Sequence, residues 1–519
     1  MKQKLLGFFL LCTLLIGTSY AQERRISGKV TEENGSGLPG VSVIVSGTTN
    51  GTQTDGQGNY AIAVPADAKA LTFSYIGYKS VVEEISGRTT LNVVLSSNAS
   101  ELSEVIVTGY GTQKRQEFTG SAASVRGDVI KSMPIQSFGQ GLTGQATGVN
   151  VVQPNGLLNN APVIRVRGLS SLSLSSFPLV VVDGIPITTD NATQFEGTNL
   201  NAASNNPLGD INPADIESMD ILKDAASSAI YGSRAAAGVL VITTKKGKEG
   251  KTSVVYDGWV GNTKAIRLQD LLNAEQYVSH KNSALANALA LNPNAVPSGQ
   301  RDEQGRGFFL DYNDDGSVVD TRWYDEIYRS AWQQNHNLTI SGGTEKTKYY
   351  FSAGLADQDG FLKSNNFKRK SGRMNIDHQL TNWLKLNANV NYTNTQNNAP
   401  NSGSIDGAAY NSSGLGRIAM VQMPNVRPFN PDGSYNLEGN AIGRGANLVP
   451  AQYSNPYPLI DLDKNSSETN RLLANLGATI KLAEGLNFRT TYSWDLRNIE
   501  NQRFWNPIQG DGRSSTGQA

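Results

Sequence analysis

Long runs of alternating apolar and polar residues fill the chain from residue 252 onward. In LKLNANVNYT, Leu384 and every second residue up to Tyr392 are apolar, while Lys385 and the asparagines fall between them. A period of two is typical of a β-strand with one apolar face. RLLANLGATIKL and LNFRTTYSWDL repeat it. The pattern predicts strands near residues 252–264, 333–343, 346–358, 370–381, 384–396, 469–482 and 485–500.

The links between these strands are sorted by length. Tight turns at GGTEK, TNW and AEG alternate with one medium link and two long ones of about 68 and about 72 residues. A soluble β-sandwich also alternates along its strands, but it has no reason to sort its loops. Short turns at one end and long loops at the other are typical of a transmembrane β-barrel. A plugged barrel of this kind has about 22 strands, so we expect an incomplete barrel and the N-terminal half of a longer protein.

Short strand-like runs separated by turn residues occupy residues 26–96. RISGKVT, PGVSVIVSG, GNYAIAV, ALTFSYIGYKS and TTLNVVLS have the spacing of a small β-sandwich. With its TDGQGNY turn, this region resembles the carboxypeptidase-regulatory-like domain, a transthyretin-like sandwich. A peptidase is not expected, because His280, His336 and His378 begin no HExxH or HxxE pattern for a catalytic zinc.

Residues 112–248 predict a small α+β domain. FPLVVVDGIPI is an apolar strand ended by the turn pair Asp183-Gly184, and AAAGVLVITTKK is a second strand. Between them, DIESMDILKDA has one apolar face. These phrases, with GLTGQATGVNVVQ and VIRVRGLSS, closely resemble the plug domain of TonB-dependent outer-membrane transporters of the SusC/RagA family. The resemblance extends from about residue 26 onward.

The resemblance implies that basic plug side chains face acidic groups on the barrel wall. On that basis we expect plug anchoring by Arg165, Arg167, Gly168, Asp183, Gly184, Tyr231, Gly232 and Arg234. A buried ion pair holds an element in one position while adding little net stability, which suits a removable plug. The alternative is that the three arginines are ordinary solvated residues.

A β-branched stretch lies between two polar ones after the sandwich. EVIVTG resembles the TonB box of the family, and it comprises Glu104, Val105, Ile106, Val107, Thr108 and Gly109. A tethered strand offers main-chain hydrogen bonds to a partner, so we expect the periplasmic protein TonB to bind here by strand addition. The alternative is a linker or a last strand of the sandwich.

Two other motifs are weaker. Gly139, Gly141 and Gly144 match a dinucleotide fingerprint, but no strand precedes them and no suitable acid follows, so a tight turn is expected. The segment 311–316 resembles the start of a calcium loop, but its twelfth position is Arg322 rather than glutamate, so a solvated acidic loop is the favoured interpretation. No GxSxG elbow is present. We therefore expect no catalytic residue, cofactor or metal.

The N-terminus has the anatomy of an export signal. Lys2 and Lys4 precede an apolar run over residues 5–16, which is too short to span a membrane, and small residues follow at Ser19 and Ala21. Lys+Arg and Asp+Glu are both 45, so no basic field indicates nucleic acid. The single cysteine, Cys12, lies in the signal, so the exported chain forgoes disulfides. We expect residence in the outer membrane of a Gram-negative-type bacterium, in contact with its lipid.

We predict that the mature protein begins at Gln22. Removal of residues 1–21 follows from the short apolar run and the small residues before the cleavage point. N-terminal sequencing or intact mass of the membrane form measures this. A retained Met1 or a lipidated Cys12 would contradict it.

The function expected from the resemblance is TonB-dependent import of a bulky nutrient. It implies a SusD-like surface lipoprotein as partner, and a glycan or oligosaccharide as cargo, with a peptide as the other option. External aromatics such as Trp323, Tyr324, Tyr328, Tyr453 and Tyr457 could contact either cargo or the lipoprotein. Two alternatives are a signalling receptor of the same architecture and a secreted β-rich adhesin.

Overall fold

The computed structural model describes most of the chain. It covers residues 24–96 (without 33–34, 49, 66–67, 76–77 and 79), the backbone of 105–108 and 111–114, 120–189 (without 132, 134, 136, 154–155 and 171–175), 206–292, 307–400, and 414–513 (without 440, 450–452 and 510–511). The predicted signal peptide, Glu104 and Gly109 lie outside the described residues. The predicted mainly β fold, with a sandwich, an α+β plug and the strands of an incomplete barrel, is confirmed.

The N-terminal unit is a two-sheet sandwich. One sheet has the order β4-β1-β7 and the other β3-β2-β5-β6. The strands are β1 (Arg24–Glu32), β2 (Ser42–Val45), β3 (Gly51–Gln53), β4 (Asn59–Val64), β5 (Ala70–Ser74), β6 (Val81–Glu84) and β7 (Val93–Leu95). Alternate residues of β4 are buried, and Ile26, Leu71 and Phe73 are fully buried in the common core. Burial of this apolar core stabilises the sandwich without disulfides.

The predicted tether strand is present as β8 (Val105–Thr108). It pairs with β9 (Gly111–Lys114) in a two-stranded sheet of its own. An isolated two-stranded sheet is only marginally stable in water.

The plug, residues 120–248, is built on a five-stranded sheet of order β10-β15-β16-β13-β14. Its strands are β10 (Ala122–Arg126), β13 (Leu179–Val182), β14 (Ile185–Pro186), β15 (Ile216–Leu222) and β16 (Val239–Thr244). A hairpin, β11 (Val149–Val152) with β12 (Val163–Val166), lies beside it. The short helices are α2 (Gly127–Lys131), α3 (Phe138–Gly141), η2 (Pro213–Asp215), α4 (Ala225–Ser228) and η3 (Ala229–Ala235).

The central plug strands are buried on both faces. Val180 and Val182 of β13 pack into one core, while Leu179 and Val181 pack into the other. The predicted turn pair follows β13: Asp183 and Gly184 have φ of 49° and 87°, and Val182 pairs with Ile185 across them. Two successive positive φ values suit a tight hairpin turn, which explains the Asp-Gly sequence.

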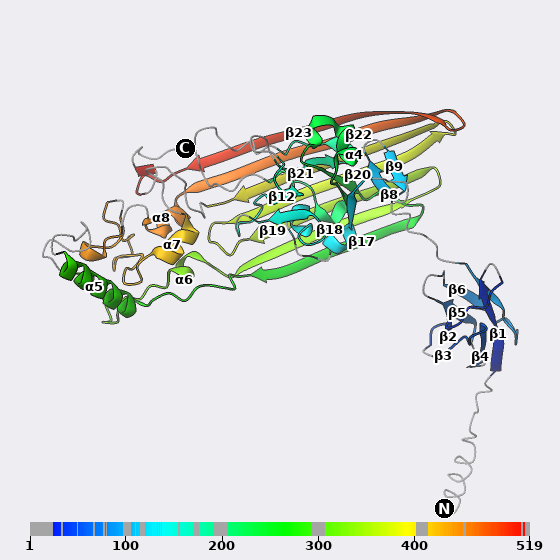
Figure 1. Ribbon diagram of the computed structural model, residues 1–519, viewed down its shortest axis with the longest axis horizontal. Helices are drawn as coiled ribbons and strands as arrows, with labels where there is room; N and C mark the ends of the chain where they lie inside the picture. The colour runs from blue at the N-terminus through cyan, green and yellow to red at the C-terminus, as the bar shows by residue number, and fades with distance from the viewer. Residues whose placement is uncertain are drawn as a thin grey trace, which may run out of the picture. The chain divides into compact units, whose positions relative to one another are not determined.

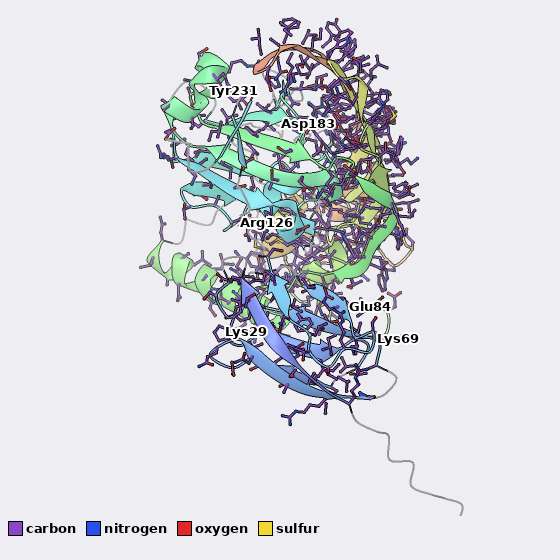
Figure 2. The ribbon with its side chains drawn as sticks, turned by 90° about the vertical axis from the view of Figure 1, so that its right-hand side faces the viewer. Lys29, Lys69, Glu84, Arg126, Asp183 and Tyr231 are labelled. Atoms are coloured by element: carbon purple, nitrogen blue, oxygen red, sulfur yellow. The ribbon has the colours of Figure 1, made fainter. Side chains whose placement is uncertain are left out.

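The remaining strands form one curved antiparallel sheet, here called the wall (Figure 1). It runs in chain order through β17 (Gly250–Thr263), β18 (Ala331–Gly343), β19 (Thr347–Asp359), β20 (Asn366–Thr381), β21 (Leu384–Asn398), β22 (Lys464–Ala483) and β23 (Leu486–Phe504). The predicted strands are confirmed, with ends that differ by a few residues. The sheet curves around one side of the plug (Figure 2).

Polarity across the wall is inverted relative to a soluble sheet. On β21, Asn391, Thr393 and Thr395 are buried toward the plug, whereas Tyr392 is half-exposed on the outer face. Val254, Leu355 and other apolar side chains are likewise exposed outward. This arrangement is that of a barrel with a polar interior and an apolar exterior band.

The described parts of the two long links contain helices. They carry α5 (Ala274–Leu291), α6 (Trp323–Ile327), α7 (Leu415–Val421), η4 (Gly445–Asn447) and α8 (Pro456–Asp461), and the tight turns lie at 344–346, 382–383 and 484–485. The N-cap of α5 is Asn273, which forms a capping box with Gln276. In the part of the chain that the structure describes, none of the helices has the length and apolarity needed to cross a membrane.

Candidate functional site: the contact between plug and wall

One short plug segment makes polar contacts with six of the seven strands of the wall. Residues 206–215, NPLGDINPAD, are here called the clasp. Leu208 and Ile211 point into the plug core, whereas Asp210, Asn212 and Asp215 contact the wall. The clasp bonds side chains from six neighbouring strands: Asn337, Tyr350, Arg369, Ser371, Thr395, Arg471 and Arg497.

Asp210 is the charged centre of the clasp. Its Oδ2 lies 3.3 Å from Arg471 Nη1 and 3.2 Å from Arg497 Nε, and Thr395 Oγ1 donates to its Oδ1 at 3.4 Å. The side chains of Asp210 and Arg471 are 1% and 0% exposed. Burial raises the pKa of Asp210, and the two arginines oppose this by favouring the carboxylate.

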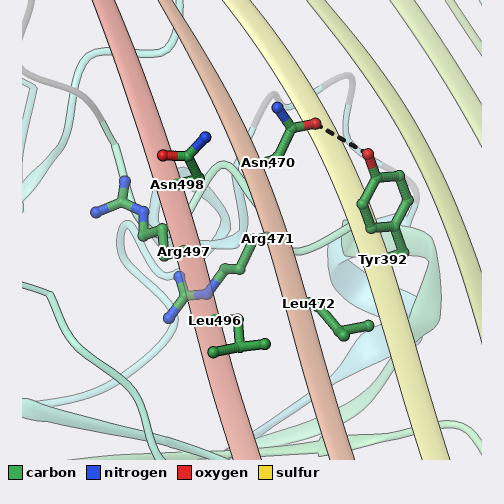
Figure 3. A pocket seen from close by; sticks show the side chains of 7 residues that line it. All are labelled: Tyr392, Asn470, Arg471, Leu472, Leu496, Arg497 and Asn498. Atoms are coloured by element: carbon green, nitrogen blue, oxygen red, sulfur yellow. Dashed lines mark hydrogen bonds between the residues drawn. The ribbon is translucent and has the colours of Figure 1, made fainter.

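Arg471 is held from the wall side as well. Its Nε and Nη2 donate to the two carboxylate oxygens of Asp495 at 2.9 and 2.8 Å. Such a bidentate pair fixes the guanidinium plane. Asp495 therefore fixes the orientation in which Arg471 binds Asp210. Arg497 lies beside Arg471 on the adjacent strand (Figure 3).

Hydrogen bonds outside the carboxylate–arginine pairs complete the clasp. Arg369 donates to the Gly209 carbonyl at 3.1 Å and to Asn212 Oδ1 at 3.4 Å, while Asn212 Nδ2 donates to Asn337 Oδ1 at 2.7 Å. A Cβ on Gly354 would lie 2.5 Å from Asn212 Nδ2, so only glycine admits this approach. Every strand from β18 to β23 thus recognises the same plug segment.

Asp183 makes a second ion pair with the wall. Arg373 Nη2 lies 2.6 Å from its Oδ2, and both side chains are buried. Thr244 donates to Asp183 through its backbone N–H at 3.0 Å and its hydroxyl at 2.7 Å, which couples the Asp-Gly turn to the end of β16. Asn475 donates to the Asp183 carbonyl at 3.3 Å. In Figure 2, Asp183 lies nearer the wall than Tyr231 does.

Most of the predicted anchoring residues lie elsewhere. Arg165, Arg167, Gly168, Gly232 and Arg234 are exposed in this chain, and Gly184 is exposed at its turn. Tyr231 is half-buried against the core that contains Val181. We predicted basic side chains on the plug and acidic ones on the wall. Lys131 and Asp257 have this arrangement, and their Nζ and Oδ2 atoms are 2.7 Å apart. At Asp183 and Asp210 the arrangement is opposite, because the acids belong to the plug.

Arg167 lies in a strained turn within the plug. Its φ is 58°, and Gly168 follows with 94°. It favours the charged form of Asp224, which caps α4. The pKa of Asp224 is lowered chiefly by its hydrogen bond to Ser227, and further by the backbone N–H groups of Ser121 and Ser227.

The glycine motif is partly helical and not wholly the expected turn. Gly139 and Gly141 belong to α3, and both must be glycine because a Cβ would clash with the side chains of Pro162 and Ile135. Gly144 has φ of 73° and ends the motif in a turn.

The acidic segment 311–316 is held by hydrogen bonds to Ser317, which follows it, and to Arg444 of the second long link. Ser317 donates from its N–H and hydroxyl to Asp315 Oδ1 at 2.9 and 2.6 Å, and Arg444 donates to Asp311 at 3.1 Å. Within the described ranges, no group of three or more His, Cys, Asp and Glu side chains is arranged to hold a metal ion.

The external aromatics pack into the folded links. Trp323 and Tyr324 are each 3% exposed, in two apolar clusters with residues of the other long link. Tyr457 packs on Phe429 with ring centroids 4.4 Å apart. The sequence held no sign of this for Trp323 and Tyr324, because their packing partners include residues of the other long link.

Two family models match the chain. The CarboxypepD_reg-like domain matches residues 26–107, and the TonB-dependent Receptor Plug Domain matches residues 114–239. TonB-dependent receptor P3 of Formosa agariphila is 33% identical over 95% of this chain and 44% of its own length. TonB-dependent receptor SusC of Bacteroides thetaiotaomicron is 31% identical over 89% of this chain and 43% of its own. The chain belongs to the SusC/RagA family of TonB-dependent receptors.

This SusC/RagA chain also matches a solved structure. The RagAB peptide importer in its open-open state has a TM-score of 0.61 and 26% identity, over 78% of this chain and 44% of that one. The chain spans less than half the length of these relatives.

Proposed function

We propose that the complete protein imports a bulky nutrient across the outer membrane, powered through TonB. The observation that carries this is a folded plug held by buried ion pairs against a wall that is polar inside and apolar outside. A plug that blocks a lumen must move for cargo to pass, and an energised partner supplies the work. The chain itself carries out no bond-breaking chemistry.

The proposed TonB site is residues 104–109. Support comes from the β8 backbone, which forms a strand paired only in a small sheet with β9. An incoming strand can add to such a sheet or replace β9, using main-chain hydrogen bonds. The exposed apolar band of the wall, including Val254, Tyr256 and Leu355, would contact lipid.

The proposed surface partner is a SusD-like lipoprotein, and the proposed cargo is a glycan or oligosaccharide, with a peptide as the other option. The structural relative RagAB is a peptide importer, and another relative is SusC. The folded external links, with α5 to α8, offer a surface to such a lipoprotein.

Outer-membrane fractionation and a TonB deletion test this function. We expect the complete protein in the outer membrane with heat-modifiable gel mobility, and growth on its cargo that requires TonB. Growth at the same rate without TonB would refute the import mechanism. Recovery in the culture medium would indicate a secreted protein instead.

The predicted anchoring by Arg165, Arg167 and Arg234 stays a proposal, directed at acidic wall groups other than those of the seven described strands. The Arg167→Ala plus Arg234→Ala variant of the complete protein should show raised protease sensitivity in residues 112–248, because buried partner carboxylates would lose their counter-charge. The single variants should not add simply, since they share one network. A double variant as protease-resistant as wild type would show that these arginines are solvated surface groups.

A further inference from the structure

We infer that Arg369, Arg373, Arg471 and Arg497 form an anion-favouring path along this side of the lumen once the plug moves, so that the transported cargo is anionic. The inference rests on the proposed function and names the chemical class of its cargo.

The inner face of the wall has an excess of buried positive charge. Arg369 and Arg373 are 3% and 6% exposed, and the side chains of Arg471 and Arg497 are 0% and 9% exposed. The acids on the described inner face are more exposed and already paired: Asp257 with Lys131, Asp377 with Lys385, and Asp495 with Arg471. The carboxylates that balance these arginines therefore come mainly from the plug.

On the outer face of the same strand, the positive side chains are exposed lysines rather than buried arginines. Lys368 is exposed and lies 3.5 Å from Asp357 on the adjacent strand. Lys370 is exposed outward as well. The arginines are consequently a feature of the lumen side and not of the whole sheet.

Two of the arginines are placed where an anion is needed. Arg471 and Arg497 are directly opposite in the register of β22 and β23. Like charges at such positions repel each other and destabilise a sheet. Asp210 of the plug lies between them and relieves this repulsion. When the plug leaves, Asp495 is the one carboxylate that still pairs with Arg471. The two arginines can then bind another anion in place of Asp210.

The plug shows what chemistry fits that position. Asp210 and Asp183 both present carboxylates to wall arginines, at 3.2–3.3 Å and 2.6 Å. Guanidinium groups bind carboxylates with matched geometry, and rings of arginine line anion-selective pores. A cargo rich in carboxylates would replace the plug acids one after another along the wall.

Planar-bilayer recordings of the complete protein test the inference, with urea added to displace the plug. The plug should open before the wall, because the wall keeps long ladders between neighbouring strands. In a KCl gradient we expect a reversal potential that shows anion preference. Arg471→Gln plus Arg497→Gln should reduce the anion-to-cation permeability ratio roughly two-fold, and the double Lys variant should restore it.

Lys368→Gln plus Lys370→Gln is the matched control, because it removes the same charge from the outer face of the wall. It should leave the ratio unchanged. An unselective or cation-preferring wild-type pore would overturn the inference, as would Gln variants with wild-type selectivity. Heat-modifiable mobility verifies that each variant has folded.

Two soluble oligomers test the cargo class on wild-type protein and need no variant. Hexaglutamate and oligogalacturonate should each reduce the open-pore current, while hexaglutamine and maltohexaose should not. Block by one acidic oligomer alone would assign the cargo to acidic peptides or acidic glycans respectively. Equal effects of acidic and neutral oligomers would overturn the inference. These recordings do not use TonB, so the TonB-deletion result remains a separate test of the proposed function.

Discussion

Replacing Asp210 with alanine in the complete protein is expected to loosen the plug. Arg497 loses the carboxylate within 3.2 Å, whereas Arg471 keeps Asp495. Removing one partner of a buried ion pair typically costs about 3–5 kcal/mol, and the retained Asp495 places this case toward the lower end. We expect rapid proteolysis within residues 120–248 and entry of large antibiotics into cells that lack TonB.

Glu217→Ala is the matched control, because it removes a plug acid from an exposed pair. Lys248 and Glu217 are 3.6 Å apart, with side chains 83% and 46% exposed. Exposed pairs of this kind contribute about 0–1 kcal/mol, so this variant should stay sealed. If Asp210→Ala is as sealed and protease-resistant as Glu217→Ala, the clasp does not hold the plug, and apolar packing does.

Replacing Ile106 with proline is expected to abolish growth on the cargo without affecting membrane insertion or cargo binding. Proline removes one main-chain donor from β8 and disfavours its place in a ladder, so TonB cannot add a strand there. The cost to folding should be small, because β8 belongs only to a two-stranded sheet with β9. Growth assays and surface binding of labelled cargo measure the two effects separately.

Ile106→Val provides the control for that variant. It keeps the backbone donor and the β-branched side chain, so uptake should remain close to wild type. Wild-type growth of Ile106→Pro would refute the TonB-box assignment, and loss of surface protein would show a folding defect instead.

The wall could be predicted from sequence because its signal is local. On β21, side chains alternate between lumen and exterior, and the tight turns at 382–383 and 484–485 join neighbours in the chain. The Asp183-Gly184 turn was equally readable, because two positive φ values demand such residues. The sequence did not show that the glycine motif begins in a helix, because its glycines are there to make room for Pro162 and Ile135, which are not part of the motif.

The clasp could not be predicted, because its partners are distant in the chain. Asp210 and Arg471 are brought together by the register of β22 and by the packing of Leu208 and Ile211 into the plug core. The sequence did hold a weak signal. Arg369 and Arg373 lie on the face of β20 where the adjacent strands carry mainly asparagine and threonine. The burial of Trp323 and Tyr324 could not be predicted either, because the residues that cover them are also distant in the chain.

The strand order of the plug sheet sets how fast the plug can close again. β10 pairs with β15, so Ala122 meets Leu222, and β13 pairs in parallel with β16, so Leu179 meets Val239. Such non-local pairings fold slowly, whereas the hairpins of the wall are local and fold quickly. A plug unravelled as a whole would reseal late and leave the cell permeable in the interval. For the proposed import function, fast closure would therefore require that β13, β15 and β16 stay paired throughout the cycle.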